Sequence, residues 1–244
     1  MIDKFHTDSI EVQNIIKGFN LTKSLLVSSI IIGEPHTGKK SLIRYLFPSV
    51  KFVDGADRVA VKKALEEKSE LVIYDFEKLT NIESIDFENR RIIAIANYVS
   101  NEKSIDDLFA FIYHMPSLKE RVEDIDILVK RFSKEAISNL MLDRELEIDT
   151  KLLDISANTR SLKRSVYQQA FSQNCTPKDI EEILYHYLYK NMQGNNDYKD
   201  YLPLYERPLI EAGLKKFGSQ LKLSDILGIN RNTLRKKIYE LNIN

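Results

Sequence analysis

The first half of the chain alternates uninterrupted apolar runs with segments in which apolar residues recur every three or four positions. The uninterrupted runs predict strands covered on both faces, and the periodic segments predict amphipathic helices. The predicted strands are residues 25–32, 50–53, 71–75, 91–97 and 109–115, and the predicted helices between them are 10–19, 41–47 and 56–68. Strands that alternate with helices indicate an α/β fold with a parallel sheet.

The pattern changes after Pro116, where strand signals stop and helical periodicity continues to residue 192. Three helices are predicted there, within residues 123–141, 161–171 and 177–192. A polar stretch at 193–203 contains glycine and asparagine and is expected to be a linker. We therefore predict four parts: an α/β subdomain (1–117), an all-α subdomain (118–192), the linker (193–203) and an all-α C-terminal domain (204–244).

Composition limits the class of protein. Hydrophobic residues make up 43% and charged residues 30% of the 244 positions, as in ordinary globular proteins. No apolar run approaches the roughly 20 residues of a membrane span, and the N-terminus lacks the pattern of a secretory signal. Cys175 is the only cysteine, so no internal disulfide can form. We expect a cytoplasmic protein without a membrane partner.

The net charge of zero conceals an uneven distribution. Residues 201–244 contain eight basic and four acidic side chains, so this segment carries +4 and the first 200 residues carry −4. A cationic end on an anionic body suggests that the end is the part that meets a polyanion.

The strongest motif in the α/β part is the sequence GEPHTGKK, which follows an apolar run and precedes a helix. Glycines in Gly-x4-Gly-Lys spacing let backbone N–H groups turn inward toward phosphate oxygens, and the lysine reaches the terminal phosphates. An ordinary strand-to-helix turn is the alternative. Lys40 stands where many such loops place a hydroxyl residue for magnesium. The residues predicted to bind ATP or ADP are Gly33, Glu34, Pro35, His36, Thr37, Gly38, Lys39, Lys40 and Ser41.

An acid at the end of a later apolar run suits a hydrated Mg²⁺ ion. Asp75 ends the run LVIYD and is the predicted metal residue. The acid that commonly orients the attacking water directly follows this residue, but here that position is Phe76 and the acid is Glu77. Adjacent side chains of an extended segment point opposite ways, which leaves open whether Glu77 reaches the side of the missing acid beyond the strand end. Magnesium binding is expected, and hydrolysis is in doubt.

The order of these segments resembles the bacterial enhancer-binding proteins of the NtrC type, AAA+ ATPases that activate the RpoN-type sigma factor. The resemblance is carried by GEPHTGKK, IIAIAN, MPSLKERVEDIDILVKRF and SANTRSLKRSV. It implies an AAA+-like P-loop sheet followed by a helical lid over residues 118–192. It also makes Asn97 a candidate sensor of the γ-phosphate and Arg160 a second sensor.

Two features of that family are missing from the sequence. Residues 48–70 have no room for the G-A-F-T-G-A loop that grips the sigma factor, and residues 104–114 contain no arginine to act in trans. Such an arginine contributes on the order of 10³-fold or more to hydrolysis. We therefore predict a regulator that binds ATP but hydrolyses it weakly or not at all. The alternatives are an active ATPase that remodels the sigma factor holoenzyme, with RNA polymerase as a partner, and a scaffold without nucleotide.

The C-terminal segment predicts a DNA-binding unit. Helices are expected at 210–217, 222–228 and 230–241, and the short second helix, tight turn and basic third helix are typical of a helix-turn-helix. Ile226, Leu227 and Leu234 are among the positions expected to face inward. The segment resembles the Fis-type domain that closes NtrC-type proteins. The residues predicted to contact double-stranded DNA are Asn230, Arg231, Asn232, Thr233, Arg235, Lys236 and Lys237.

Recognition by one short helix reads few bases, so a homodimer or a higher homo-oligomer is expected. The aromatic stretch LYHYLY at 184–189 has two interpretations, a dimer contact or core packing of the lid. The four histidines show no metal-ligand spacing.

Overall fold

The computed structural model describes residues 5–82, 85, 87, 89–99, 102–143 and 145–243, with only the backbone of 102–104. The chain divides into two compact units, Met1–Cys175 and Thr176–Asn244. Each unit is described here by itself. None of the helices in the described ranges combines the length and apolar content that crossing a membrane requires.

The first unit is built on a five-stranded parallel sheet with strand order β2-β3-β4-β1-β5. The strands are β1 (Ser29–Ile32), β2 (Lys51–Asp54), β3 (Glu70–Tyr74), β4 (Arg91–Ala96) and β5 (Phe111–His114). The predicted parallel α/β fold is confirmed. The first strand is shorter than predicted, because Leu25 and Leu26 lie before it and remain 48% and 54% exposed.

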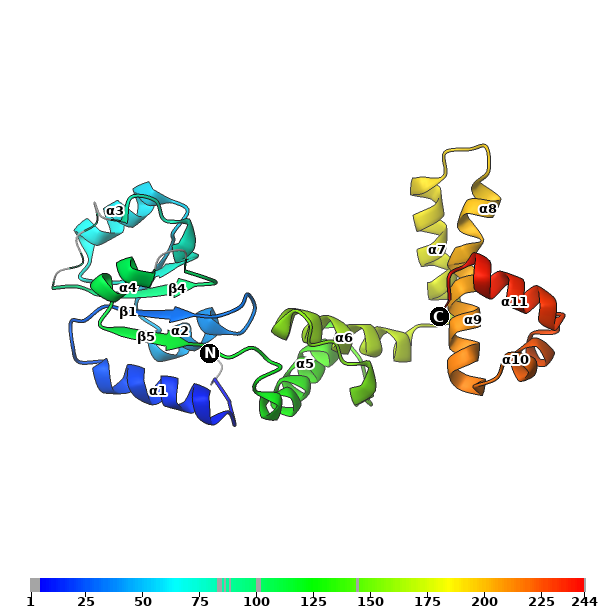
Figure 1. The fold of residues 1–244 in the computed structure, drawn as a ribbon, viewed down its shortest axis with the longest axis horizontal. Helices are drawn as coiled ribbons and strands as arrows, with labels where there is room; N and C mark the ends of the chain where they lie inside the picture. Colours follow the sequence, from blue (N-terminus) through cyan, green and yellow to red (C-terminus); the bar gives the residue numbers. More distant parts are fainter. Residues whose placement is uncertain are drawn as a thin grey trace. The chain divides into compact units, whose positions relative to one another are not determined.

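Helices cover both faces of this sheet (Figure 1). Helices α1 (Ile10–Thr22) and α2 (Lys39–Leu46) pack on one face, and α3 (Arg58–Glu67) and α4 (Glu102–Leu108) pack on the other. Because side chains alternate along a strand, Ile31 joins the core under α1 and α2, whereas its neighbour Ile30 joins the core under α3.

The sheet order brings three chain segments to one edge. Strands β3, β4 and β1 are neighbours, and the residues that follow them are Asp75, Asn97 and Gly33. Ligands of open parallel sheets bind outside the carboxyl ends of the strands. The candidate residues from three separate motifs therefore lie close together at this edge.

A helical pair completes the first unit. Helices α5 (Ile125–Asn139) and α6 (Asn158–Asn174) share a small core. Its buried residues are Leu118, Leu128, Phe132, Leu162 and Val166. We call this pair the lid.

The second unit consists of α7 (Pro177–Asn191), α8 (Asp197–Tyr201), α9 (Pro203–Phe217), α10 (Gln220–Leu227) and α11 (Arg231–Glu240). Three expectations differ here. Helix α7 groups with this unit rather than with the lid, the predicted linker contains α8, and α9 begins before residue 210. The capping box between Thr176 and Asp179, with Pro177 at the first turn, starts α7 as a new helix.

Candidate functional site

The segment between β1 and α2 forms a tight loop of residues 33–38. Gly38 caps α2 with a φ of 96°, a left-handed value that favours glycine. A Cβ atom on Gly33 would lie 2.4 Å from the carbonyl oxygen of Met115, so the loop begins in direct backbone contact with the end of β5. These two positions explain why the motif needs both glycines.

Three consecutive carbonyl groups of this loop accept hydrogen bonds from the lid side. The Pro35 oxygen accepts from the Asn158 Nδ2 at 3.0 Å. The His36 oxygen accepts from the backbone N–H of Thr159 at 3.1 Å and from its hydroxyl at 2.6 Å. The Thr37 oxygen accepts from the guanidinium of Arg121, which is 2% exposed. The lid thus holds the loop from its outer side.

This arrangement aims the loop's donors at the opposite side. Peptide units are planar and trans, so a carbonyl that points one way directs the next N–H the other way. The N–H groups of His36, Thr37 and Gly38 have no hydrogen-bond partner within the described ranges. Consecutive unpaired N–H groups beside the N-terminus of α2 form an anion-binding concavity.

Lys39 lies on the inner side of the loop and is 5% exposed. Its ammonium donates to the carbonyl oxygens of Gly33 at 2.6 Å and Glu34 at 2.7 Å, and to the Asn97 Oδ1 at 3.3 Å. Burial lowers the pKa of Lys39 to about 8, although the nearby carboxylates of Glu77, Asp75 and Glu34 oppose the shift. The lysine is therefore a buried cation poised for an anionic partner.

Glu77 also reaches the site at the carboxyl ends of the strands, a placement that the sequence alone did not decide. Its carboxylate accepts hydrogen bonds from the side chain of Asn97 at 2.6 Å and from the Asn97 backbone at 3.2 Å. The cause is local: Asp75 has a φ of 51°, and a 3₁₀ turn over Phe76–Lys78 follows it. The turn ends the strand alternation and brings the acid around to the site.

The surroundings of Asp75 do not suit a divalent cation. The Lys78 ammonium lies 2.6 Å from the Asp75 Oδ2, and this hydrogen bond raises the pKa of Lys78. Lys40 occupies the position of the usual hydroxyl residue. The described residues contain no group of three or more acids, histidines or cysteines that could hold a metal. The magnesium site predicted at Asp75 gains no support from these contacts.

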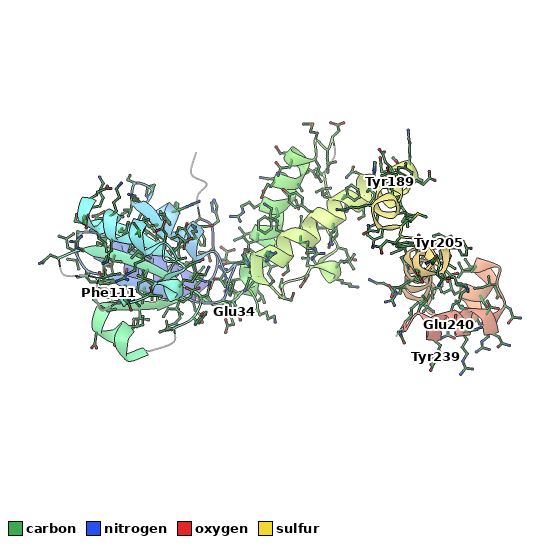
Figure 2. All side chains as sticks on the ribbon, turned by 90° about the horizontal axis from the view of Figure 1, so that it is seen from above. Glu34, Phe111, Tyr189, Tyr205, Tyr239 and Glu240 are labelled. Carbon is green, nitrogen blue, oxygen red and sulfur yellow. The ribbon has the colours of Figure 1, made fainter. Side chains whose placement is uncertain are left out.

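Arg160 follows the loop-binding residues of α6 and is exposed. It lines a hollow of about 1090 Å³ formed mainly by α5 and α6, which His36 of the loop and His6 also border. Glu135 is the one acid among the described lining residues, and it pairs with Lys163 at 2.5 Å. The other ionisable lining residues are His6, His36, Lys130, Arg131, Lys134 and Arg160. Figure 2 shows Glu34 of the loop beside the lid, where its carboxylate accepts from Asn158 at 2.9 Å.

Arg121, Asn158 and Thr159 are the site residues that sequence reasoning missed. Arg121 lies in a segment that supported only a resemblance, and no periodicity shows which loop residue will bury a guanidinium. Asn158 has a φ of 54° and uses its side-chain oxygen to accept the Leu118 N–H at 2.7 Å. The contacts of Arg121 and Asn158 with the loop span more than 80 residues, so no local sequence pattern predicts them.

The second candidate site lies on α11. Gly228 ends α10 with a φ of 64°, and the Asn230 side chain caps α11 by accepting the Asn232 N–H at 2.8 Å. A small core holds the helices together, formed by Ile210, Leu223, Leu234 and Leu241. The expectation that Ile226 faces inward is wrong, because it is 51% exposed at the end of α10.

Most of the predicted DNA-binding residues are open to solvent. Those exposed are Asn230, Arg231, Asn232, Thr233, Arg235 and Lys236. Lys237 differs: it is partly buried and its ammonium pairs with Glu206 of α9. Figure 2 labels the exposed neighbours Tyr239 and Glu240 on the same helix. The exposed cations therefore lie mainly along the first half of α11.

The described residues thus combine a glycine-bracketed loop on a parallel α/β sheet, a helical lid and a terminal helix-turn-helix. Residues 201–241 match the family described as bacterial regulatory protein, Fis family. The C-terminal residues of the chain are therefore similar to Fis-type helix-turn-helix domains.

Curated proteins and solved structures are similar to parts of this chain. The chain is 30% identical over 166 residues to the DNA-binding transcriptional regulator NtrC of Azospirillum brasilense, covering 53% of this chain and 34% of that protein. It is 31% identical over 169 residues to NtrC of Rhizobium meliloti (strain 1021), covering 53% and 35%. The chain thus spans about a third of the length of these relatives. The fold is similar to NtrX of Brucella abortus in complex with ATP, with a TM-score of 0.57, 14% identity, and 99% and 70% coverage.

The lid contacts generate a first prediction. Thr159→Val removes the hydroxyl that donates to His36 while keeping the shape of the side chain, so we expect faster exchange of the Gly33 and Leu42 amides, whose hydrogen bonds flank the loop. Hydrogen–deuterium exchange with mass spectrometry measures this. Thr159→Ser should restore slow exchange. Ser172→Ala, which removes a hydroxyl bonded only within α6, should change nothing in the loop. Equal exchange in Thr159→Val and the unmodified chain would contradict the role of the lid.

Proposed function

We propose that this protein is a sequence-specific transcription regulator whose helix-turn-helix reads double-stranded DNA and whose AAA+-type body binds ATP or ADP. The observation that carries the proposal is the exposed basic face of α11, set on a helix-turn-helix core. Residues near the start of such a helix reach base edges, with Arg suited to guanine and Asn to adenine. Lys236, farther along, suits phosphate contacts that are independent of sequence.

We also propose that the regulator binds DNA as a dimer. Helix α7 buries none of its residues, which favours the dimer contact as the role of the aromatic stretch. Tyr185 and Tyr189 are 61% and 78% exposed and stack with ring centroids 6.0 Å apart; Figure 2 labels Tyr189. A second copy of the same helix would cover this apolar face and supply the second recognition helix.

Nucleotide binding by the body is supported by the loop. The unpaired N–H groups and the buried ammonium of Lys39 suit a polyphosphate. The titles of solved NtrX structures describe that protein in complex with ATP and with ADP. Asn97 and Arg160 are proposed as residues that respond to the terminal phosphate. Bound nucleotide would then set the position of the lid through the loop carbonyls.

Hydrolysis is proposed to be weak, because the segment expected to supply arginines in trans has none. One contact favours the second candidate function, an ATPase that remodels the sigma factor holoenzyme together with RNA polymerase. That contact is the pairing of Glu77 with Asn97, which places an acid where it could orient water.

DNA recognition gives the next prediction. Arg235→Ala should weaken specific DNA binding by about 1–3 kcal/mol if the guanidinium reads a base. Genome-wide mapping of bound DNA would first identify the sites, which should show two-fold symmetry. Competition binding at physiological salt then measures the loss. Lys62→Ala removes a charge from the exposed face of α3 and should leave specific DNA binding unchanged. A chain that prefers no genomic site would overturn the assignment.

Nucleotide affinity should depend on pH through Lys39. The pKa of this lysine is about 8, so its charge is present below that pH and lost as the pH rises through it. If only the protonated form binds phosphate, the dissociation constant for ADP should rise about tenfold between pH 7 and pH 9. Calorimetric titration measures the change. Lys39→Arg keeps its charge and should remove most of this dependence. The same pH profile in both proteins would assign it to another group.

Steady-state phosphate release separates the two candidate functions. We expect turnover at least about 10³-fold below that of an arginine-assisted ATPase. Glu77→Gln should change this low rate little and leave nucleotide binding intact. Rapid turnover that is abolished by both Lys39→Ala and Glu77→Gln would instead establish the motor.

A further inference from the structure

Lys40 has surroundings that differ from those of an ordinary surface lysine. It follows Lys39 in the first turn of α2 and is only partly exposed. Its ammonium lies 3.2 Å from the centroid of the Tyr74 ring. Tyr74 is the last residue of β3 and directly precedes Asp75. The charge is thus fixed between the start of α2 and the end of β3, where two chain segments of the nucleotide site meet.

The pKa of Lys40 reflects the burial of its ammonium group and the charges near it. Burial and the nearby Arg44 lower the pKa of Lys40, whereas the carboxylates of Asp75 and Asp54 raise it. Lys40 is therefore close enough to Asp75 to interact with it. A cation over an aromatic face gains about 0.5–2 kcal/mol, and a lysine head on its four-carbon stem can exchange that contact for a phosphate oxygen.

The same place offers little to a magnesium ion. Mg²⁺ in nucleotide sites is commonly held by phosphates, waters and one or two protein oxygens. Here the candidate carboxylate, Asp75, is already paired with Lys78, and the hydroxyl position is occupied by Lys40. Ser41 is exposed, and one residue along a helix turns a side chain by about 100°. An added dication would also be repelled by the two ammonium groups.

We propose that Lys40 takes the place of the divalent cation, so that this chain binds the phosphates of ADP and ATP without Mg²⁺. The inference rests on the proposed nucleotide binding and deepens it. Lys39 and Lys40, which follow the loop at the start of α2, together carry two positive charges, the charge that one magnesium ion would bring. Tyr74 holds the second of these ammonium groups in place before the ligand arrives.

The test is calorimetric titration of the full chain with ADP, in excess Mg²⁺ and in excess EDTA. The unmodified chain should bind ADP in EDTA at least as tightly as in Mg²⁺, because Mg²⁺ complexes free ADP and the two ammonium groups repel the added dication. Lys40→Ser removes the charge and supplies a hydroxyl. Its affinity in EDTA should fall about tenfold or more, as expected for a lost charge-assisted contact, and Mg²⁺ should restore part of it.

Two further variants control the result. Lys40→Arg keeps the charge, and its dissociation constants for ADP in Mg²⁺ and in EDTA should show the same relation as those of the unmodified chain. Lys63→Ser makes the same change on the exposed face of α3 and should bind like the unmodified chain. Thermal melting confirms that each variant is folded. A tenfold or greater loss in EDTA for the unmodified chain, or no effect of Lys40→Ser, would overturn the proposal. Absence of ADP binding in either condition would refute nucleotide binding itself, while the DNA assay would still stand.

Discussion

The outer grip of the lid on the phosphate loop is the constraint on which the nucleotide site depends. A loop of six residues has many possible backbone conformations, and ordering each residue costs about 1–2 kcal/mol of entropy. Hydrogen bonds from Arg121, Asn158 and Thr159 fix three successive carbonyls and thereby orient the N–H groups opposite them. The conformation of the loop therefore depends on both the sheet and the lid, because the donors that order the loop come from outside the α/β part.

The same grip extends to the start of the described chain. Asp124 pairs with Arg121 at 3.2 Å and also accepts the Thr7 hydroxyl at 2.8 Å and the Asp8 N–H at 2.7 Å. Both ionic partners are almost fully buried, and a buried charge persists only when it is paired and hydrogen-bonded. Residues 7 and 8 are thus connected to the phosphate loop through two side chains. A conformational change in the loop is therefore expected to shift residues 7 and 8, and a change at these residues is expected to shift the loop.

The sequence sufficed for the parts of the structure that are encoded locally. The apolar runs that contain β1 and β4 predicted a parallel sheet, and the glycine spacing predicted the position of the loop. Prediction from the sequence failed where tertiary contacts, or the backbone conformation of a single residue, determine the structure. Glu77 enters the site because Asp75 adopts a left-handed conformation, which strand alternation does not reveal. The placement of α7 was missed because helical periodicity marks an apolar face but not the partner that covers it.

The order in which this molecule can assemble follows from the length of chain between the loop and its donors. Pro35 and Asn158 are 123 positions apart, and Thr37 and Arg121 are 84 apart. Contacts between such distant residues form late, since closing a long loop costs entropy before the contact returns any energy. During synthesis the sheet strands emerge well before α6 does. A nascent chain would therefore acquire its hydrophobic layers first and its capacity to hold phosphate only after the ribosome has passed residue 159.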